Sequence, residues 1–307
     1  MIGKTIFDNL KERFKDGDTF RILFCPYKQE MWDSMETIYE AALKDKETVS
    51  GIMPIPYFTL MNNLPVEARM EFRYDAFPHL LNEGWDVIVF HYPYDLLNNV
   101  TRPMVTSTHL KRFCKHLVLV HYACLGDRDI QDKEALYPGV KNSDIVVWET
   151  EKQASHAQRV LEAYCHWKGE CVAWGSAKYD LLRKMPMPNE WKRVINGRPT
   201  VLLQTSVIPL MNNPNKLEQI KKVLEENKDK CIIWRPHPLY EATILSHRPE
   251  DYEEYMKIKD EFLKTDNIFD FYAAPEIAIG VADEMISDQS SLINLWKQTG
   301  KKLTMLE

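Results

Sequence analysis

The chain has 307 residues, 45% of them hydrophobic and 27% charged, which is typical of a globular protein with one large core or two ordinary ones. Its formal net charge of −6 argues against a dedicated nucleic-acid-binding protein, which would carry a basic excess. No apolar run reaches the ~18 residues that a membrane span needs. We therefore expect a cytoplasmic protein with at most peripheral contact at the inner membrane face.

The first half of the chain alternates between apolar runs of strand length and amphipathic, helix-like segments. A charged amphipathic helix is predicted at the N-terminus. The strand-like runs that follow are 21–27, 49–58, 85–94, 116–124, 142–150 and 171–176. Because these runs are almost continuously apolar, we expect strands buried on both faces, in a parallel sheet covered by helices. Alternation of strands and helices at this spacing is the βαβ pattern.

A stretch with three prolines and a glycine, 183–199, separates this first series from a second one. Strand-like runs begin the second series at 200–210 and 231–236, and a charged helix is predicted to start near Pro249. We predict an α/β protein with two facing Rossmann-like domains, an N-terminal one over 1–180 and a C-terminal one over 181–307. The last apolar run has no covering helix after it, so the second domain is expected to be short or truncated.

The run CIIWRPHPLY places a histidine between two prolines directly after an apolar strand. Pro236 and Pro238 restrict the backbone on both sides of His237 and hold its imidazole on a stiff loop. Arg235 adds a cation that can form two parallel hydrogen bonds with a phosphate. Alone, His237 could equally be a turn histidine with local hydrogen bonds.

The run EMISDQSSLINLW carries a second polar cluster at a predicted strand end. Asp288 or Ser290 is a suitable N-cap for the helix that follows. The first-turn N–H groups and the hydroxyls of Ser290 and Ser291 could bind a phosphate. Since ligands of open α/β sheets bind beyond the carboxyl ends of the strands, we expect this cluster and His237 to share one diphosphate.

The order and spacing of these runs resemble the CDP-glycerol:poly(glycerophosphate) glycerophosphotransferase family of teichoic-acid-type transferases, which have the GT-B architecture. The resemblance is carried by the run from Arg235 to Pro238 and by the run from Ile286 to Ser291. A third match is Gly175-Ser176-Ala177-Lys178-Tyr179-Asp180, which is similar to the Gly-x-Pro-(Arg/Lys)-x-Asp motif near the family's domain crossover. The resemblance is clear over about 170–307 and faint before that.

The resemblance implies a cytidine diphosphate donor bound mainly by the C-terminal nucleotide-donor domain, 181–307, and an acceptor-side N-terminal domain, 1–180. His237, a catalytic candidate, and the turn containing Ser290 and Ser291 would contact its phosphates. Arg235 and Asp288 are further candidates for that substrate-binding site, as are Gly175 and Ser176 at the crossover. A first-domain histidine at a strand end would be the general base on the acceptor hydroxyl. The best match is His121, whose imidazole can take a proton at cytoplasmic pH.

Three positions depart from the family pattern. Tyr122 stands where a glycine usually follows the catalytic histidine, Gln289 replaces a tyrosine, and Ala177 replaces the crossover proline. These departures leave open a different donor, such as a nucleotide sugar, or an inactive homologue that only binds nucleotide within a synthase complex. His91, at the end of another predicted strand, is a second candidate for the base. For either histidine a structural role remains an alternative.

Neither a cofactor nor a metal is predicted. The six cysteines form no CxxC pair and are expected to be free thiols in a reducing compartment. No His, Cys and Asp cluster has zinc-site spacing. We therefore expect a transferase that moves glycerol phosphate, or a related polyol phosphate, from a CDP-activated donor to a polymer or lipid-linked acceptor at the cell surface. A GT-B glycosyltransferase using a nucleotide sugar is the alternative.

Overall fold

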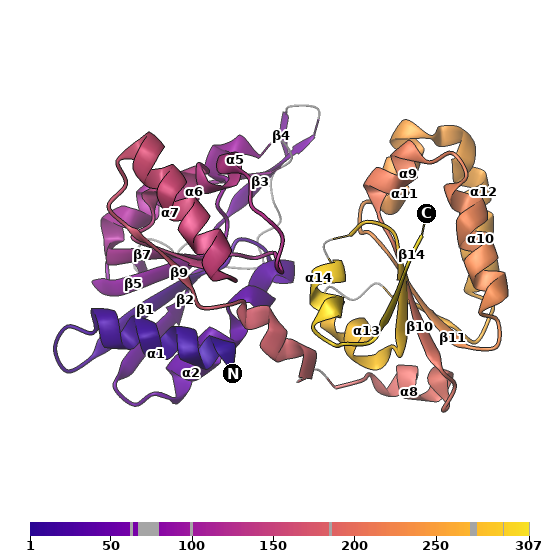
Figure 1. Ribbon diagram of the computed structural model, residues 1–307, viewed down its shortest axis with the longest axis horizontal. Coiled ribbons are helices and arrows are strands. Elements are labelled where there is room, and N and C mark those ends of the chain that lie inside the picture. Colours follow the sequence, from indigo (N-terminus) through magenta and orange to yellow (C-terminus); the bar gives the residue numbers. More distant parts are fainter. Residues whose placement is uncertain are drawn as a thin grey trace. The chain divides into compact units, whose positions relative to one another are not determined.

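The computed structural model describes residues 1–61, 64–66, 80–98, 101–183, 186–270, 275–290 and 292–306. The chain divides into two compact units, Met1–Leu181 and Leu182–Glu307 (Figure 1). Each unit is described by itself. Both are parallel α/β layers, so the predicted fold class is confirmed.

The first unit is built on a six-stranded sheet in the order β2-β1-β5-β7-β8-β9, and every neighbouring pair in it is parallel. Its strands are β1 (Phe20–Cys25), β2 (Thr48–Ile52), β5 (Trp85–Phe90), β7 (Cys114–Val120), β8 (Ile145–Trp148) and β9 (Glu170–Ala173). Strand β5 is buried along its whole length. Its almost continuous apolar sequence therefore reflects cover on both faces.

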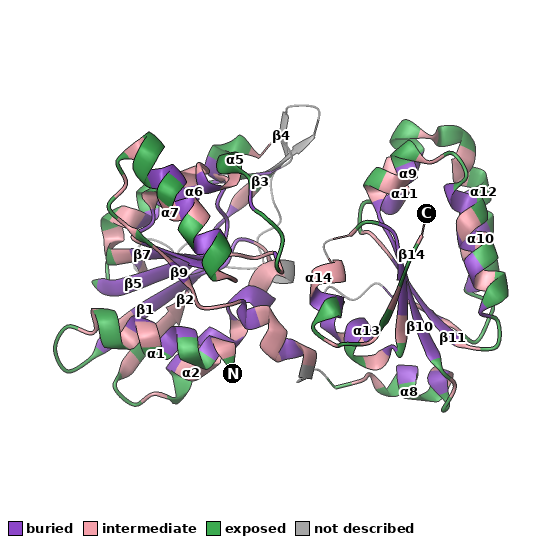
Figure 2. Cartoon of the chain, viewed as in Figure 1, coloured by how far each residue is buried: buried purple, intermediate pink, exposed green. Residues whose placement is uncertain are grey.

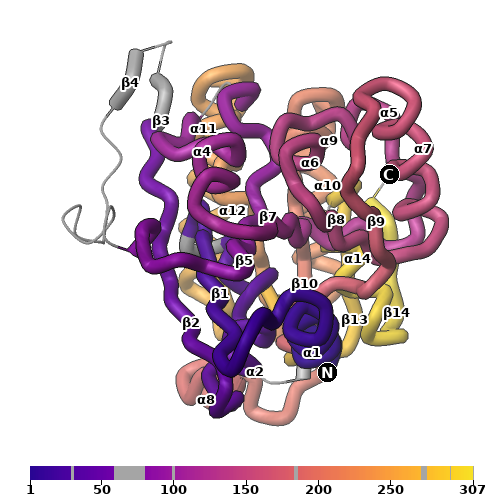
Figure 3. Tube along the Cα trace, turned by 90° about the vertical axis from the view of Figure 1, so that its left-hand side faces the viewer, coloured from indigo at the N-terminus to yellow at the C-terminus, as the bar shows by residue number. Residues whose placement is uncertain are grey.

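Helices cover both faces of this sheet. Helices α1 (Ile2–Phe14) and α2 (Glu36–Lys44) pack side by side on one face, and α7 (Glu151–Cys165) covers the other (Figures 1 and 3). Shorter helical segments complete the layers: η1 (Gln29–Ser34), η3 (Asp95–Leu97), α4 (Ser107–Leu110), η4 (Lys111–Phe113), α5 (Asp132–Ala135), α6 (Pro138–Asn142) and η5 (Ala177–Arg183).

A small antiparallel sheet in the order β4-β3-β6 belongs to the first unit. Its strands are β3 (Tyr57–Met61), β4 (Leu64–Val66) and β6 (Thr101–Pro103). Residues 57–58 therefore do not end a parallel-sheet strand as expected, and the strand at 101–103 is one that was not predicted. Three-residue strands that contain a proline, as β4 and β6 do, lack the length and alternation that identify a strand in a sequence.

The second unit is built on a five-stranded parallel sheet in the order β12-β11-β10-β13-β14. Its strands are β10 (Thr200–Thr205), β11 (Cys231–Pro236), β12 (Ile268–Phe269), β13 (Glu284–Ser287) and β14 (Lys302–Met305). The chain leaves β10 for β11 and β12 on one side, and then returns to β13 and β14 on the other. The strand order therefore reverses at β10, which is the kind of point where ligands bind in open α/β sheets.

Helices α10 (Lys216–Glu226) and α12 (Tyr252–Phe262) lie on one face of this sheet, and α13 (Pro275–Val281) and α14 (Leu292–Lys297) lie on the other (Figure 1). The remaining segments are α8 (Asn189–Ile195), α9 (Val207–Asn212), α11 (Tyr240–His247) and η6 (Pro249–Asp251). Pro249 thus begins a helical segment, as predicted. The strands are largely buried and the helices expose their outer surfaces (Figure 2).

The start of α1 is fixed by a residue far along the chain. The Asp180 carboxylate accepts hydrogen bonds from the backbone N–H groups of Ile2 at 3.0 Å and Gly3 at 2.8 Å. It also accepts one from the Thr37 hydroxyl at 3.2 Å. A Cβ atom added at Gly3 would lie 2.0 Å from Thr37 Oγ1, so only glycine allows α1 to approach α2 this closely. Asp180 therefore joins the first and last helical segments of the unit.

None of the helices in the described ranges combines the length and apolarity that crossing a membrane requires. Within the same ranges, no three His, Cys, Asp or Glu side chains gather in a way that could hold a metal ion.

Candidate functional site

The carboxyl edge of the second sheet brings together several residues singled out in the sequence. Thr205 at the end of β10 pairs with Pro236 at the end of β11, and Gln204 pairs with Ser287 at the end of β13. The residues that follow these strands therefore lie at the same edge. Among them are His237 after β11 and the turn from Asp288 to Ser290 after β13.

His237 is held with one ring nitrogen available. Its backbone N–H donates to the Thr205 carbonyl at 2.8 Å, which ties the loop after β11 to the end of β10. Its Nδ1 accepts the Leu239 N–H at 3.1 Å. The ring proton is therefore assigned to Nε2, which is a donor. Burial lowers the pKa of His237 below its usual value, and so the imidazole is neutral at pH 7.

Ser290 caps α14. Its Oγ accepts the Leu292 N–H at 3.1 Å, and its carbonyl accepts the Ile293 N–H at 3.3 Å. Of the two predicted caps, Ser290 is therefore the correct one. Ser291 lies outside the described residues.

Asp288 points into the unit and does not cap α14. Its side chain is buried, and Oδ2 accepts the Ser206 N–H at 3.0 Å. The same oxygen lies 3.1 Å from Nζ of Lys216, which is also buried. The prediction that Asp288 could cap the following helix is thus wrong, because a buried lysine and the end of β10 take its carboxylate.

Arg235 also makes an internal contact. Its Nη1 donates to Asp270 Oδ2 at 2.6 Å, and the two side chains are 10% and 0% exposed. Charged hydrogen bonds of this kind are among the stronger ones in proteins. The guanidinium therefore has a structural task, and its contact with a ligand remains a prediction.

Gly175 and Ser176 belong to the first unit. Gly175 adopts the left-handed conformation with φ of +86°, which glycine accommodates without strain, and its N–H donates to the Trp148 carbonyl at 3.1 Å. Ser176 is buried, with its Oγ 3.9 Å from Sγ of Cys124. Substrate binding by these two residues remains a prediction.

The residues after Ser176 tie the crossover segment to the first unit. Lys178 pairs with Asp33 at 2.6 Å, and the Tyr179 hydroxyl donates to Glu149. Asp180 in addition contacts α1. Lys178, Tyr179 and Asp180 of the motif therefore have a structural role in the first unit. These partners could not be predicted from the sequence, because they lie in distant segments of the chain.

His121 follows β7, and its side chain is partly exposed. Its ring packs against Trp148 with the centroids 4.3 Å apart. Its Nε2 is buried and has no hydrogen-bond partner among the described residues. Burial lowers the pKa of His121 to about 4. The imidazole is therefore neutral near pH 7 and able to accept a proton, as a general base must.

His91 follows β5, is fully buried and uses both ring nitrogens. Its Nε2 accepts the Tyr27 N–H at 2.8 Å, and its Nδ1 lies 2.8 Å from the Ser34 hydroxyl. Because Nε2 accepts, the ring proton is assigned to Nδ1 and is donated to Ser34. Burial lowers the pKa of His91 to about 3. His91 thus joins two loops, and His121 is the better candidate for the base.

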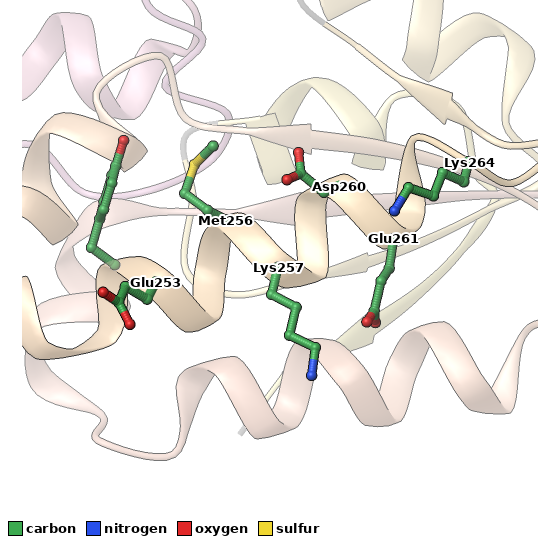
Figure 4. Close-up of a pocket in the computed structure, with 7 residues that line it drawn as sticks. Glu253, Met256, Lys257, Asp260, Glu261 and Lys264 are labelled. Atoms are coloured by element: carbon green, nitrogen blue, oxygen red, sulfur yellow. The ribbon is translucent and has the colours of Figure 1, made fainter.

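A surface hollow on the second unit lies along α12 (Figure 4). It is lined by Tyr252, Glu253, Met256, Lys257, Asp260, Glu261 and Lys264. Met256, Asp260 and Lys264 project to one side of the helix, and Glu253, Lys257 and Glu261 to the other (Figure 4). The hollow thus contains side chains of mixed charge without a point of convergence, and it includes none of the predicted site residues.

Comparison with known proteins identifies the fold. No family model and no curated protein sequence matches the chain. Among solved structures, UDP-GlcNAc 2-epimerase from Methanocaldococcus jannaschii aligns with a TM-score of 0.56 and 15% identity, over 94% of this chain and 84% of that one. The S. aureus MnaA–UDP co-structure aligns with a TM-score of 0.55 and 11% identity, over 94% and 79%.

The wall teichoic acid polymerase TagF aligns with a TM-score of 0.51 and 12% identity, over 98% of this chain and 73% of TagF. Identities this low show a shared fold. The chain therefore has the two-unit α/β architecture called GT-B.

Proposed function

We propose that the chain is a GT-B enzyme that binds a nucleoside diphosphate-linked donor at the carboxyl edge of its second sheet. The observation that carries this proposal is the placement of His237, with its Nε2–H donor, and Ser290 after β11 and β13, the two strands that flank β10 at the reversal of strand order. The names of two matched structures support the choice of ligand. One is a complex of MnaA with UDP, and another is a Neisseria meningitidis epimerase bound to UDP-GlcNAc.

The reaction we propose first is transfer of glycerol phosphate or a related polyol phosphate from a CDP-linked donor to a hydroxyl group. His121 Nε2 takes the proton of the acceptor hydroxyl, and the oxygen forms a bond to the phosphorus that bears the polyol. The bond from that phosphorus to the bridging oxygen breaks, and CMP leaves with the electron pair. The His237 Nε2–H and the Ser290 hydroxyl stabilise the charge that develops on the leaving phosphate.

A second candidate is chemistry on a nucleotide sugar. The likeness to several UDP-GlcNAc 2-epimerases favours it. The donor-binding edge would then bind the diphosphate in the same way, and the group attached to the diphosphate would be a sugar.

The first test is a thermal-shift panel of CMP, CDP, CDP-glycerol, CDP-ribitol, UDP, GDP and UDP-GlcNAc. A ligand at about a hundred times its dissociation constant stabilises the native state by ~2.7 kcal/mol. For a protein of this size that raises the melting temperature by roughly 5 °C. Shifts confined to cytidine nucleotides favour polyol-phosphate transfer, and shifts confined to UDP compounds favour sugar chemistry. Absence of any shift contradicts the proposal.

The His237→Ala variant is expected to bind nucleoside diphosphate about tenfold more weakly, because it loses one hydrogen bond to a charged group. Isothermal titration with the nucleotide identified by the panel measures the effect. His247→Ala, which removes an exposed histidine from α11 of the same unit, is the matched control and should bind as the wild type does. Equal affinity of the His237→Ala variant and the wild type would remove His237 from the phosphate site.

A further inference from the structure

A buried ion pair lies where the strand order of the second sheet reverses. Lys216, the first residue of α10, places Nζ 3.1 Å from Asp288 Oδ2, and the two side chains are 1% and 2% exposed. The same oxygen accepts the N–H of Ser206, the residue after β10, at 3.0 Å. Lys216 and Asp288 therefore lie at the carboxyl ends of β10 and β13, next to the turn that contains Ser290.

Stability does not account for this pair. Burying an ammonium and a carboxylate costs several kcal/mol for each ion, and replacing such a pair with apolar residues is often neutral or stabilising. The pair is also incompletely satisfied, because Asp288 Oδ1 is buried and has no hydrogen-bond partner within the described ranges. A role at the neighbouring ligand-binding edge accounts better for its presence.

The charge of Asp288 poses a problem for an anionic ligand. Asp288 precedes Ser290 by two residues, and the proposed donor carries a diphosphate. Two unit charges ~10 Å apart, at an effective dielectric constant of about 20, change an affinity by roughly tenfold. An isolated carboxylate at this edge would therefore repel the ligand with a force that grows with the ligand's own charge.

We propose that Lys216 neutralises Asp288 and thereby allows this edge to bind a nucleoside diphosphate. Lys216 is a positioning residue, since it acts through Asp288 and does not itself touch the ligand. The Asp288 carboxylate in turn orders Ser206 and so joins the ends of β10 and β13. This inference rests on the proposed function and adds the electrostatic condition under which the donor is accepted.

The test compares the affinities of cytidine, CMP and CDP, and of the matching uridine series, by isothermal titration calorimetry. Lys216→Met keeps the length of the side chain and removes its charge. It is expected to weaken nucleoside diphosphate binding by about tenfold or more, monophosphate binding by less, and nucleoside binding by less than about threefold. The Lys216→Met/Asp288→Asn double variant restores neutrality and should regain the wild-type ratio between diphosphate and nucleoside.

Two results would overturn the proposal: an equal loss for all three ligands, or no recovery in the double variant. Either result would mean that the pair only holds the fold. Lys222→Met is the matched control, because Lys222 lies on the same helix with its side chain 74% exposed. It should leave every affinity unchanged.

If Lys216→Met does not fold, Asp288→Asn is compared with the double variant. These two differ only in the Lys216 charge, so the variant that retains the lysine should bind diphosphate more tightly relative to nucleoside. Equal ratios would contradict the proposal.

Inorganic pyrophosphate separates this inference from the proposed function. If the wild type binds pyrophosphate and no nucleotide, the proposed function fails, and the same variants measured with pyrophosphate decide the role of Lys216. If the wild type binds neither, both proposals are overturned.

Discussion

Replacing His121 with alanine is expected to lower kcat by about 10²–10⁴-fold, the usual contribution of a positioned general base. Donor binding should stay unchanged, because His121 belongs to the first unit and the proposed donor residues belong to the second. The loss of kcat is expected because His121 Nε2 has no hydrogen-bond partner in the described ranges and can therefore take a proton. Steady-state kinetics with the donor found by the thermal-shift panel would measure the loss.

The pH dependence of the wild type gives a second readout for His121. Burial lowers its pKa to about 4, so the imidazole is in its basic form at every pH well above that value. The acid limb of the kcat/KM profile is therefore expected near pH 4 and not near the usual histidine pKa of about 6.5. The activity of the wild type should fall as the pH drops through about 4, because protonation removes the basic form of His121. This acid limb should be absent from the profile of the alanine variant.

His116→Ala is the control for this prediction. His116 lies on the same strand, β7, and its ring stacks on Phe14 with the centroids 4.0 Å apart. Its replacement should reduce stability and leave kcat unchanged. A His121→Ala enzyme with the turnover of the wild type would remove His121 from the mechanism.

Replacing Arg235 with alanine is expected to lower the free energy of unfolding of the second unit by about 3–5 kcal/mol. The Asp270 side chain is 0% exposed, and the variant leaves its carboxylate without the guanidinium at 2.6 Å. Urea unfolding followed by tryptophan fluorescence would measure the change, since Trp234 is the neighbouring residue and is fully buried. The shift should appear in the transition of the second unit.

Arg193→Ala is the matched control, because Arg193 is exposed on α8 of the same unit. Its effect should stay within about 0.5 kcal/mol. If Arg235→Ala instead left stability unchanged and abolished nucleotide binding, Arg235 would serve the ligand and not the fold.

The alternation of buried strands and helices could be predicted because each long strand appears in the sequence as a short apolar run, which depends only on neighbouring residues. The strand β11 and the loop that follows it are an example: CIIWRP predicts a buried strand, and topology then places His237 at the carboxyl edge. The cap at Ser290 could be predicted for the same reason, because an N-cap depends on residues within one helical turn.

The partners of the charged residues could not be predicted. Arg235 and Asp288 were expected to face a ligand, yet Arg235 pairs with Asp270 and Asp288 pairs with Lys216. These partners lie in other elements of the sheet, and only the packed unit determines which charges meet. Lys216 itself stands in a charged helical segment where a lysine signals nothing beyond solvent exposure.

The cap that Asp180 provides for α1 has a consequence for biosynthesis. The hydrogen bonds to Ile2 and Gly3 span 178 and 177 residues of chain. At the usual translation rates of 5–20 residues per second, the ribosome needs roughly ten to forty seconds to make that stretch. Until then the first N–H groups of α1 cannot acquire this partner. A nascent chain stalled between residues 174 and 179 should therefore contain all six strands of the first sheet and still lack the carboxylate that caps α1.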